Sequence, residues 1–254
     1  MNAPLPRTFP AESFDTLNWS AIGTQLDREG YAALRGLFDA DEARALAREA
    51  VTSNALRRVA LESLDLGRGD LLYFDTALPR VWAQWCTDFY RQLAPVANRW
   101  NAMLCMPYRF PAEWKAFLEC NDRAGQTQAQ LYLNRLGADD YLALHQRSKG
   151  EHVFPLQVVV LLSAPGRAFI GGELVLTEQR PRMQSRPMVV PLSLGDAAII
   201  ATAQRPFKGS SGYYPVNLRH AVSRVRSGER IGVELSFHDA PRASGDEHPF
   251  ILGT

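Results

Sequence analysis

The pattern of hydrophobic positions changes once along this chain, near Gln126. Before that point, apolar residues recur every three or four positions, which is the spacing of a helix face packed on a core. After it, short apolar runs are separated by glycine, proline and aspartate, as in strands joined by turns. The pattern therefore predicts a mainly helical first half and a second half built of strands.

The first half contains several segments with helical spacing. Trp19, Ile22 and Leu26 lie on one face of a helix that Gly30 would end. A short apolar run at Tyr31–Leu34 is a candidate first strand. Further helices are predicted over residues 42–51, 81–103 and 111–120, the last with Pro111 at the favoured N-terminal position.

The second half contains eight short apolar runs with turn residues between them. Many short strands with regular turn signals are typical of a double-sheet jelly roll or barrel. The predicted strands are Ala129–Leu133, Leu142–His145, Phe154–Leu162, Glu173–Thr177, Met188–Pro191, Ala197–Ala201, Ala221–Val225 and Ile231–Phe237.

We therefore expect an α+β fold, a double-stranded β-helix (jelly roll) buttressed by N-terminal helices. A single domain would span residues 1–254, with mainly helical support over 1–125, the jelly-roll core over 126–240 and a C-terminal tail over 241–254. Residues Met1–Pro10 hold three prolines and no long apolar run, so we expect a loose tail there.

Composition narrows the setting without naming a function. The net charge is +1, so no global field favours a nucleic acid or a membrane surface. The three cysteines are an odd number without a Cys-x-x-Cys motif, which favours reduced thiols. No stretch approaches the roughly 20 apolar residues of a membrane helix. We expect a soluble, cytoplasmic protein, and the sequence does not predict its oligomeric state.

Two histidines and an arginine are the first candidates for chemistry. His145 ends an apolar strand, a place where a histidine is more often solvated or hydrogen-bonded than a metal ligand. His220 and Arg230 lie ten residues apart across a Ser227–Gly228 turn. Even separations keep side chains on one face of a strand, allowing for the turn. We therefore expect His145, His220 and Arg230 to line one cavity.

These residues stand in an order that resembles the 2-oxoglutarate/Fe(II) oxygenase superfamily over roughly Gln128 to Asp239. The elements of that order are His145, Gly171-Gly172-Glu173-Leu174, Gly195-Asp196, His220 and Arg230. The segment Asn134-Arg135-Leu136 through Leu144-His145-Gln146 further resembles bacterial AlkB-type nucleic-acid dealkylases, whose run is Asn-Arg-Tyr to Leu-His-Gln-Asp. Blocks at residues 152–157, 178–182 and 219–224 look closer still to a bacterial oxygenase family grouped with oxidative repair of alkylated DNA.

The resemblance implies an iron site and a cosubstrate site. His145 and His220 would bind Fe(II), and Arg230 would pair with the distal carboxylate of 2-oxoglutarate through its planar guanidinium. Asn134 would contact the same cosubstrate, whereas Leu136 replaces a hydroxyl-bearing tyrosine. The implied partners are this small-molecule cosubstrate and, as a further possibility, a nucleic-acid substrate.

Arg147 stands at the catalytic position where the superfamily has its carboxylate ligand. A guanidinium has no lone pair to give a metal and is always charged. Three explanations remain open: the iron has been lost and the protein only binds; two histidines hold the metal while Arg147 swings outward; or Glu151 supplies the missing carboxylate. The functional hypotheses are accordingly an oxygenase that hydroxylates or demethylates its substrate and a catalytically silent jelly-roll binding protein.

Basic residues gather in a later part of the chain, next to Tyr213 and Tyr214. They are Arg180, Arg182, Arg186, Arg205 and Lys208. Cations interleaved with aromatic rings can hold a nucleic-acid strand. The alternative is a solvated loop beside the core, which the small net charge favours. We expect a long loop over Gln204–Pro215, bordering the mouth of the jelly roll.

Overall fold

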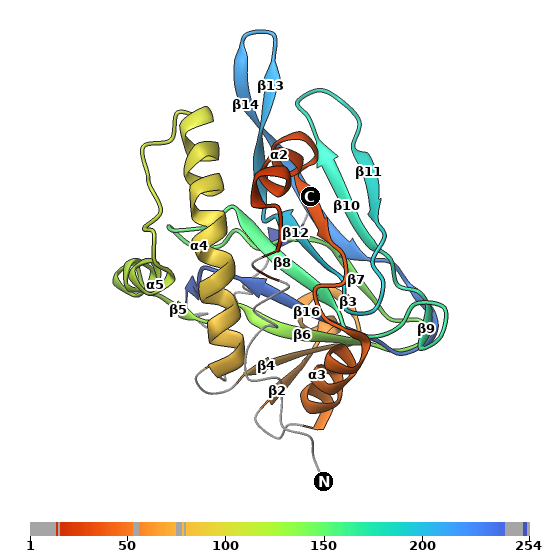
Figure 1. The fold of residues 1–254 in the computed structure, drawn as a ribbon. Helices are drawn as coiled ribbons and strands as arrows, with labels where there is room; N and C mark the ends of the chain where they lie inside the picture. Colours follow the sequence, from red (N-terminus) through yellow and green to blue (C-terminus); the bar gives the residue numbers. More distant parts are fainter. Residues whose placement is uncertain are drawn as a thin grey trace.

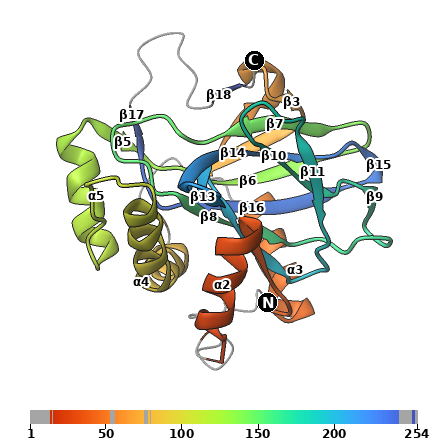
Figure 2. The same cartoon turned by 90° about the horizontal axis from the view of Figure 1, so that it is seen from above.

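Two antiparallel sheets face each other in the computed structural model, which describes residues 14, 16–52, 56–74, 78, 80–241 and 251–252. The predicted tail at Met1–Pro10 and most of the one at 241–254 lie outside these residues. Figure 1 shows the two sheets, and Figure 2 shows helices on the outer side of one of them. The predicted α+β jelly roll supported by N-terminal helices is confirmed.

Among the described residues, each of the two sheets has seven strands, and the first contains β16 (Arg230–Ser236) and the strands that pair beside it. Their order is β1 (Tyr31–Leu34), β12 (Ala197–Ala201), β8 (Leu156–Leu161), β16 (Arg230–Ser236), β6 (Leu131–Leu136), β4 (Asp70–Phe74) and β2 (Leu56–Ala60). The short 3-10 helix η1 (Leu61–Leu64) follows β2.

The second sheet contains the remaining long strands. Its order is β11 (Arg186–Val190), β10 (Leu174–Gln179), β14 (Gly212–Val222), β7 (Tyr141–Gln146) and β18 (Ile251–Leu252), with β13 (Gln204–Gly209) on β14 and β3 (Gly67–Arg68) on β7. Two short pairs complete the strands: β15 (Val225–Gly228) with β9 (Phe169–Gly171), and β17 (Ala240–Pro241) with β5 (Gln126–Gln128).

Four α-helices in the described part of the chain lie where helical spacing was predicted. They are α2 (Trp19–Glu29), α3 (Ala40–Thr52), α4 (Arg80–Met103) and α5 (Trp114–Arg123). The last begins at Trp114, so the prediction of Pro111 as its first residue is wrong. The Asn18 side chain caps the start of α2 by accepting from the Ala21 amide, and Gly30 ends it with φ 77°. No helix within the described residues is long and apolar enough to cross a membrane.

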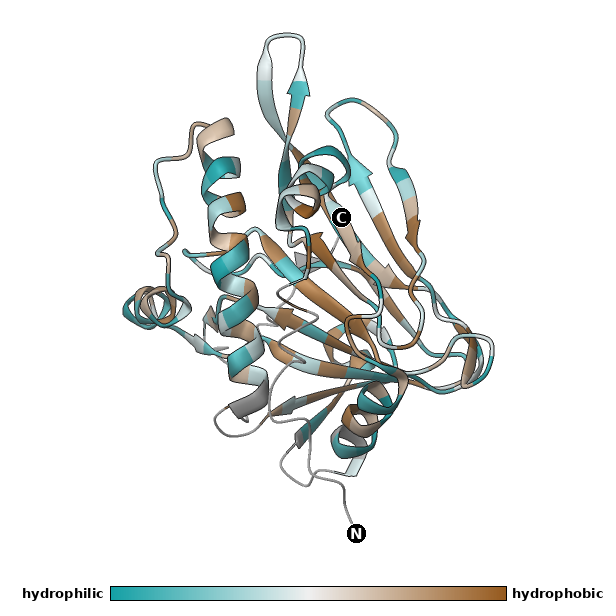
Figure 3. Ribbon diagram, viewed as in Figure 1, coloured by the Kyte–Doolittle hydropathy of each residue, from teal (hydrophilic) through white to brown (hydrophobic). Residues whose placement is uncertain are grey.

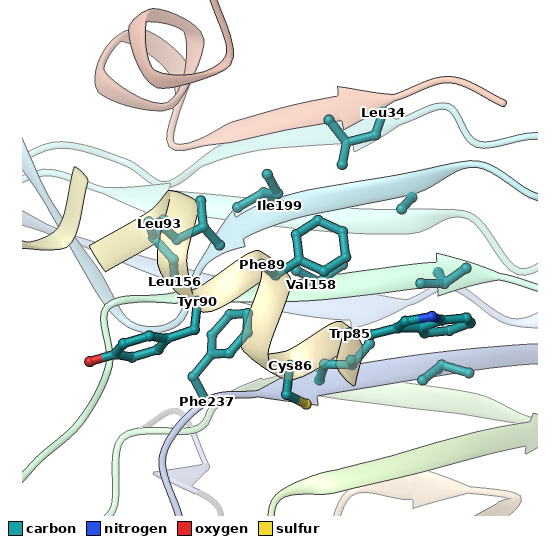
Figure 4. Close-up of a cluster of buried hydrophobic side chains, with 14 of the residues drawn as sticks. Leu34, Trp85, Cys86, Phe89, Tyr90, Leu93, Leu156, Val158, Ile199 and Phe237 are labelled. Atoms are coloured by element: carbon teal, nitrogen blue, oxygen red, sulfur yellow. The ribbon is translucent and has the colours of Figure 1, made fainter. Parts of the chain in front are cut away.

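Helix α4 covers the outer face of the first sheet, the one that contains β8 and β16. Its buried Trp85, Phe89 and Tyr90 pack toward Val158 on β8 and toward Phe237, the residue that follows β16 (Figure 4). Strand β16 shows how this layer positions the interior. Val233 and Leu235 belong to the helix-side cluster, so the alternate side chains, including Glu234, point between the two sheets.

Two further parts of the structure differ from the prediction. The first half, predicted as mainly helical with one strand at Tyr31–Leu34, also contains the unpredicted strands β2, β3 and β4, and β4 pairs with β6 far along the chain. Such short strands are stabilised by distant partners that local spacing does not reveal. The predicted loop over Gln204–Pro215 is instead the β13–β14 hairpin, which pairs Gln204 with Asn217 and Gly209 with Gly212.

Candidate functional site

The two candidate histidines lie side by side between the sheets. His145 on β7 and His220 on β14 are direct partners in the strand register. Their ring centroids are 4.1 Å apart, and both side chains are buried. Pairing of β7 with β14 therefore brings together residues that are far apart in the sequence.

A carboxylate from the facing sheet completes a cluster with them. Glu234 on β16 offers an oxygen to the group, and the ligand atoms of His145, His220 and Glu234 all lie within 4.8 Å of one another. The His220 Nε2 atom is 3.2 Å from Glu234 Oε2. The alternative of Glu151 as the substitute carboxylate is wrong, because that side chain is 74% exposed beside His152.

Glu234 was not predicted from the sequence, although one signal was present. It is a charged residue inside the apolar run Ile231–Phe237, which forms a buried strand. A fully buried acid is rare unless it is paired or hydrogen-bonded. Its position in that run therefore marks it as a residue with a specific partner inside the fold.

Arg147 is one of the partners of Glu234, and its side chain is only 1% exposed. Its Nε is 3.7 Å from Glu234 Oε2, and its Nη1 donates to the Gln130 carbonyl at 2.9 Å. The guanidinium carbon lies 3.6 Å from the centre of the Tyr132 ring. The alternative in which Arg147 swings outward is therefore wrong, because the cation is held in the interior by an anion, a carbonyl and an aromatic face.

The surroundings fix the charge of this cluster. Burial alone would raise the pKa of the Glu234 carboxyl, but the hydrogen bond and charge of His220, with Arg147, lower it well below its ordinary range. Burial and the neighbouring His220 lower the pKa of His145 to about 3. At neutral pH Glu234 is therefore ionised and His145 is neutral.

Asn134 and Arg230, the predicted cosubstrate residues, bond to each other. Arg230 Nη1 donates to Asn134 Oδ1 at 2.7 Å, and Asn134 Nδ2 donates to Glu234 Oε1 at 3.1 Å. Tyr132 also donates its hydroxyl to Glu234 Oε2 at 2.6 Å. A Cβ at Gly232 would lie 2.8 Å from Arg230 Nη1, so glycine leaves the space for this chain of hydrogen bonds.

Arg230 also lines a pocket of about 270 Å³ formed largely by β9, β10, β11 and the segments beside them. Neither His145 nor His220 borders that pocket. The structure therefore joins the two histidines to each other, and it joins Arg230 to them only through Asn134 and Glu234. The expectation that all three line one cavity is wrong for this pocket.

The donor types of the cluster match a site of two histidines and one carboxylate, but Arg147 adds a cation beside its carboxylate. A fixed positive charge about 4 Å from a divalent cation is unfavourable by several kcal/mol at intermediate dielectric. Arg147 lies that close to Glu234, and both oxygens of this carboxylate already accept hydrogen bonds. The charge of Arg147 therefore opposes the binding of a divalent cation beside this carboxylate.

The predicted basic cluster is divided by the fold. Arg205 is buried and, with Arg180, forms an ion pair with the buried Glu178. Arg182, Arg186 and Lys208 are exposed. Only these three remain on the surface beside the β10–β11 and β13–β14 hairpin tips, and Arg186 lies 3.5 Å from Glu29.

Comparison with curated proteins finds relatives that cover most of the chain. "Uncharacterized protein MT2286" of Mycobacterium tuberculosis (strain CDC 1551 / Oshkosh) is 38% identical over 195 residues, which are 74% of this chain and 84% of that protein. "Uncharacterized protein Rv2227" of strain H37Rv matches with the same identity and the same coverage.

Solved structures with the same fold share little sequence with it. An oxidoreductase of the 2OG-Fe(II) oxygenase family from Burkholderia pseudomallei matches with a TM-score of 0.53 and 19% identity, over 90% of this chain and 96% of that one. A prolyl 4-hydroxylase from Phytophthora capsici matches with a TM-score of 0.56 and 15% identity, over 94% and 67%. At these identities the likeness shows the fold alone.

The sequence profile of one family matches residues 69–240, which is more than half of the chain. That family, Oxygenase-NA, is described as "Oxygenase, catalysing oxidative methylation of damaged DNA". The matched residues include the histidine pair, Arg147 and Glu234. The chain belongs to the Oxygenase-NA family, within the fold of the 2-oxoglutarate/Fe(II) oxygenases.

Proposed function

We propose that this protein is a binding member of its family that has lost iron-dependent oxidation. The observation that carries the proposal is the buried pair of Arg147 and Glu234 beside the two histidines. An ionised carboxylate in the interior needs a compensating cation and hydrogen-bond donors. Arg147 supplies that cation, and Tyr132, Asn134 and His220 supply the donors.

The cosubstrate residues support the same proposal. To receive 2-oxoglutarate as the resemblance implies, Asn134 and Arg230 would both have to face the ligand. The Asn134 amide is instead engaged at both ends, because its oxygen accepts from Arg230 and its nitrogen donates to Glu234. The oxygenase hypothesis therefore requires Arg147 and Glu234 to separate and this chain of hydrogen bonds to open, leaving buried polar groups to find new partners.

The test is an assay for 2-oxoglutarate turnover in air with Fe(II) and ascorbate, with His220→Ala as the matched control. We expect wild type and His220→Ala to form succinate at the same background rate. The anaerobic absorption spectrum of the wild-type protein with Fe(II) and 2-oxoglutarate should lack the weak visible band that chelation of 2-oxoglutarate to Fe(II) gives. Succinate formation that wild type shows and His220→Ala loses would overturn the proposal.

A single nucleic-acid strand is a second candidate ligand, and it is supported by the exposed cations. Arg182 and Lys208 lie near the tips of the two hairpins, with the exposed ring of Tyr213 beside Lys208 in the hairpin register. Figure 1 shows both tips projecting from the same end of the molecule. Cations and an aromatic ring together can hold phosphates and stack on a base. The family description, which names damaged DNA, agrees with this ligand class.

Binding of a fluorescent single-stranded oligonucleotide, followed by anisotropy at several salt concentrations, tests this candidate. Replacing both Arg182 and Lys208 by alanine should weaken binding and make the slope of log affinity against log salt shallower by about 1.4, at roughly 0.7 per lost phosphate contact. Arg44→Ala is the matched control, because Arg44 is half exposed on α3 at the other end of the molecule. Equal slopes for wild type and the double variant would exclude the hairpins as the binding surface.

A further inference from the structure

The pocket beside Arg230 is lined almost entirely by apolar side chains. Its walls include the buried residues Leu161, Phe169, Leu174 and Val190. Figure 3 shows that β10 and β11 are hydrophobic along the parts near β9 and hydrophilic toward the loop that joins them. At about 270 Å³ the pocket is slightly smaller than the roughly 300–1,000 Å³ of drug-sized ligand sites. It therefore suits a small ligand with an apolar body.

The rim of the pocket is apolar as well as its walls. Ile170 is 53% exposed and Val189 is 56% exposed, and both line the opening. Large apolar side chains that gather at a concave surface are typical of a binding site. The acidic Glu173, also in the lining, is exposed and bonded to Ser223, so its charge remains beside solvent.

Arg230 supplies a charged group to this apolar pocket. The side chain is 1% exposed, its Nε donates to the Gly172 carbonyl at 2.9 Å, and its Nη1 donates to Asn134. Its Nη2 atom makes no hydrogen bond to any residue that the structure describes. A buried guanidinium with a donor to spare is stabilised by an anion that accepts from it.

The wall is shaped around this arginine. Gly172 has φ 64°, and a Cβ there would lie 2.9 Å from Arg230 Cδ and 3.1 Å from the Phe169 ring. A side chain at this position would therefore push the guanidinium stem or the aromatic wall away. Glycine at this position therefore leaves room for the Arg230 stem beside the pocket.

We propose that this pocket binds a small monocarboxylate with an apolar body, whose carboxylate accepts hydrogen bonds from Arg230 and whose hydrocarbon part lies against Phe169 and Leu174. The inference rests on the proposed function, in which the protein binds a ligand without iron. The pocket gives that ligand a way to reach Arg230 without contacting the histidines. A dicarboxylate such as 2-oxoglutarate fits poorly, since its second charge would lie against apolar walls.

The test uses 3-methylbutanoate as the probe, in buffer containing EDTA, with binding followed by calorimetry and ligand-observed NMR. We expect wild type to bind the acid and not its neutral amide. Arg230→Met and Ile170→Asp should each weaken binding by about tenfold or more, equivalent to 1.4 kcal/mol. Leu144→Asp, a similar change at an exposed apolar residue outside the pocket, should bind as wild type does. Ile170→Asp keeps the test open if Arg230→Met does not fold, because Ile170 lies on the surface.

Three results would overturn the inference: no binding of the acid to wild type, equal binding of acid and amide, or displacement of the acid by 2-oxoglutarate. Unchanged affinity in a folded Ile170→Asp variant would also overturn it. The succinate assay is independent of this one. If the acid binds and succinate forms in a His220-dependent way, the proposed function fails and the pocket inference stands. If the acid does not bind and no succinate forms, only the pocket inference fails.

Discussion

Replacing Arg147 by aspartate should raise the affinity of the protein for Fe(II) by an order of magnitude or more. The change removes a fixed cation that lies 3.7 Å from Glu234 and adds an anionic oxygen donor near both histidines. Both effects favour a divalent cation, and 1.4 kcal/mol is already tenfold. Anaerobic titration of Fe(II) into wild type and Arg147→Asp, followed by calorimetry, measures the difference.

Two further variants separate the causes of that gain. Arg147→Leu removes the cation without adding a donor, so it should bind Fe(II) more weakly than Arg147→Asp. Adding His220→Ala to Arg147→Asp should abolish the gain, because a single histidine leaves the metal too few protein ligands. Equal affinities for wild type and Arg147→Asp would show that Arg147 does not occupy the metal position.

Removing only one partner of the buried ion pair should destabilise the protein strongly. Glu234→Leu leaves the Arg147 guanidinium buried without its carboxylate, and Arg147→Leu leaves Glu234 without its cation. An uncompensated buried charge costs about 3–5 kcal/mol of unfolding free energy. The double variant should lose less than the sum of the two single losses, because it leaves neither charge behind. Urea unfolding of the four proteins at pH 7 measures all three differences.

An exposed ion pair on α3 provides the control for this cycle. Arg44 and Asp41 are 3.0 Å apart, with Arg44 half exposed and Asp41 almost fully exposed. Such pairs contribute about 0–1 kcal/mol, so Arg44→Leu should change the unfolding free energy little. If the losses from Arg147→Leu and Glu234→Leu simply add, the two residues do not compensate each other, and the basis of the proposed function fails.

The sequence by itself predicted the helices and strands in which buried residues recur at a regular spacing. The helical spacing over residues 81–103 predicted α4, and the run Ala197–Ala201 predicted β12 with the bounds that the structure has. Neighbouring residues are enough to predict a helix or a strand, because burial of one face makes apolar positions recur every 3.6 or every 2 residues. The sequence also indicated His145 and His220 as candidate ligands, and the motif around them predicted the superfamily.

Only the tertiary structure decided what surrounds those histidines. Glu234 comes from the facing sheet, so no local pattern links it to Arg147, and the only substitute carboxylate that the neighbouring sequence suggested was the exposed Glu151, as one of three alternatives. Burial of Arg205 against Glu178 likewise turned a predicted surface cation into a core ion pair. Charge and polarity in the sequence show which residues need partners, but pairing of strands far apart in the chain determines which partners they receive.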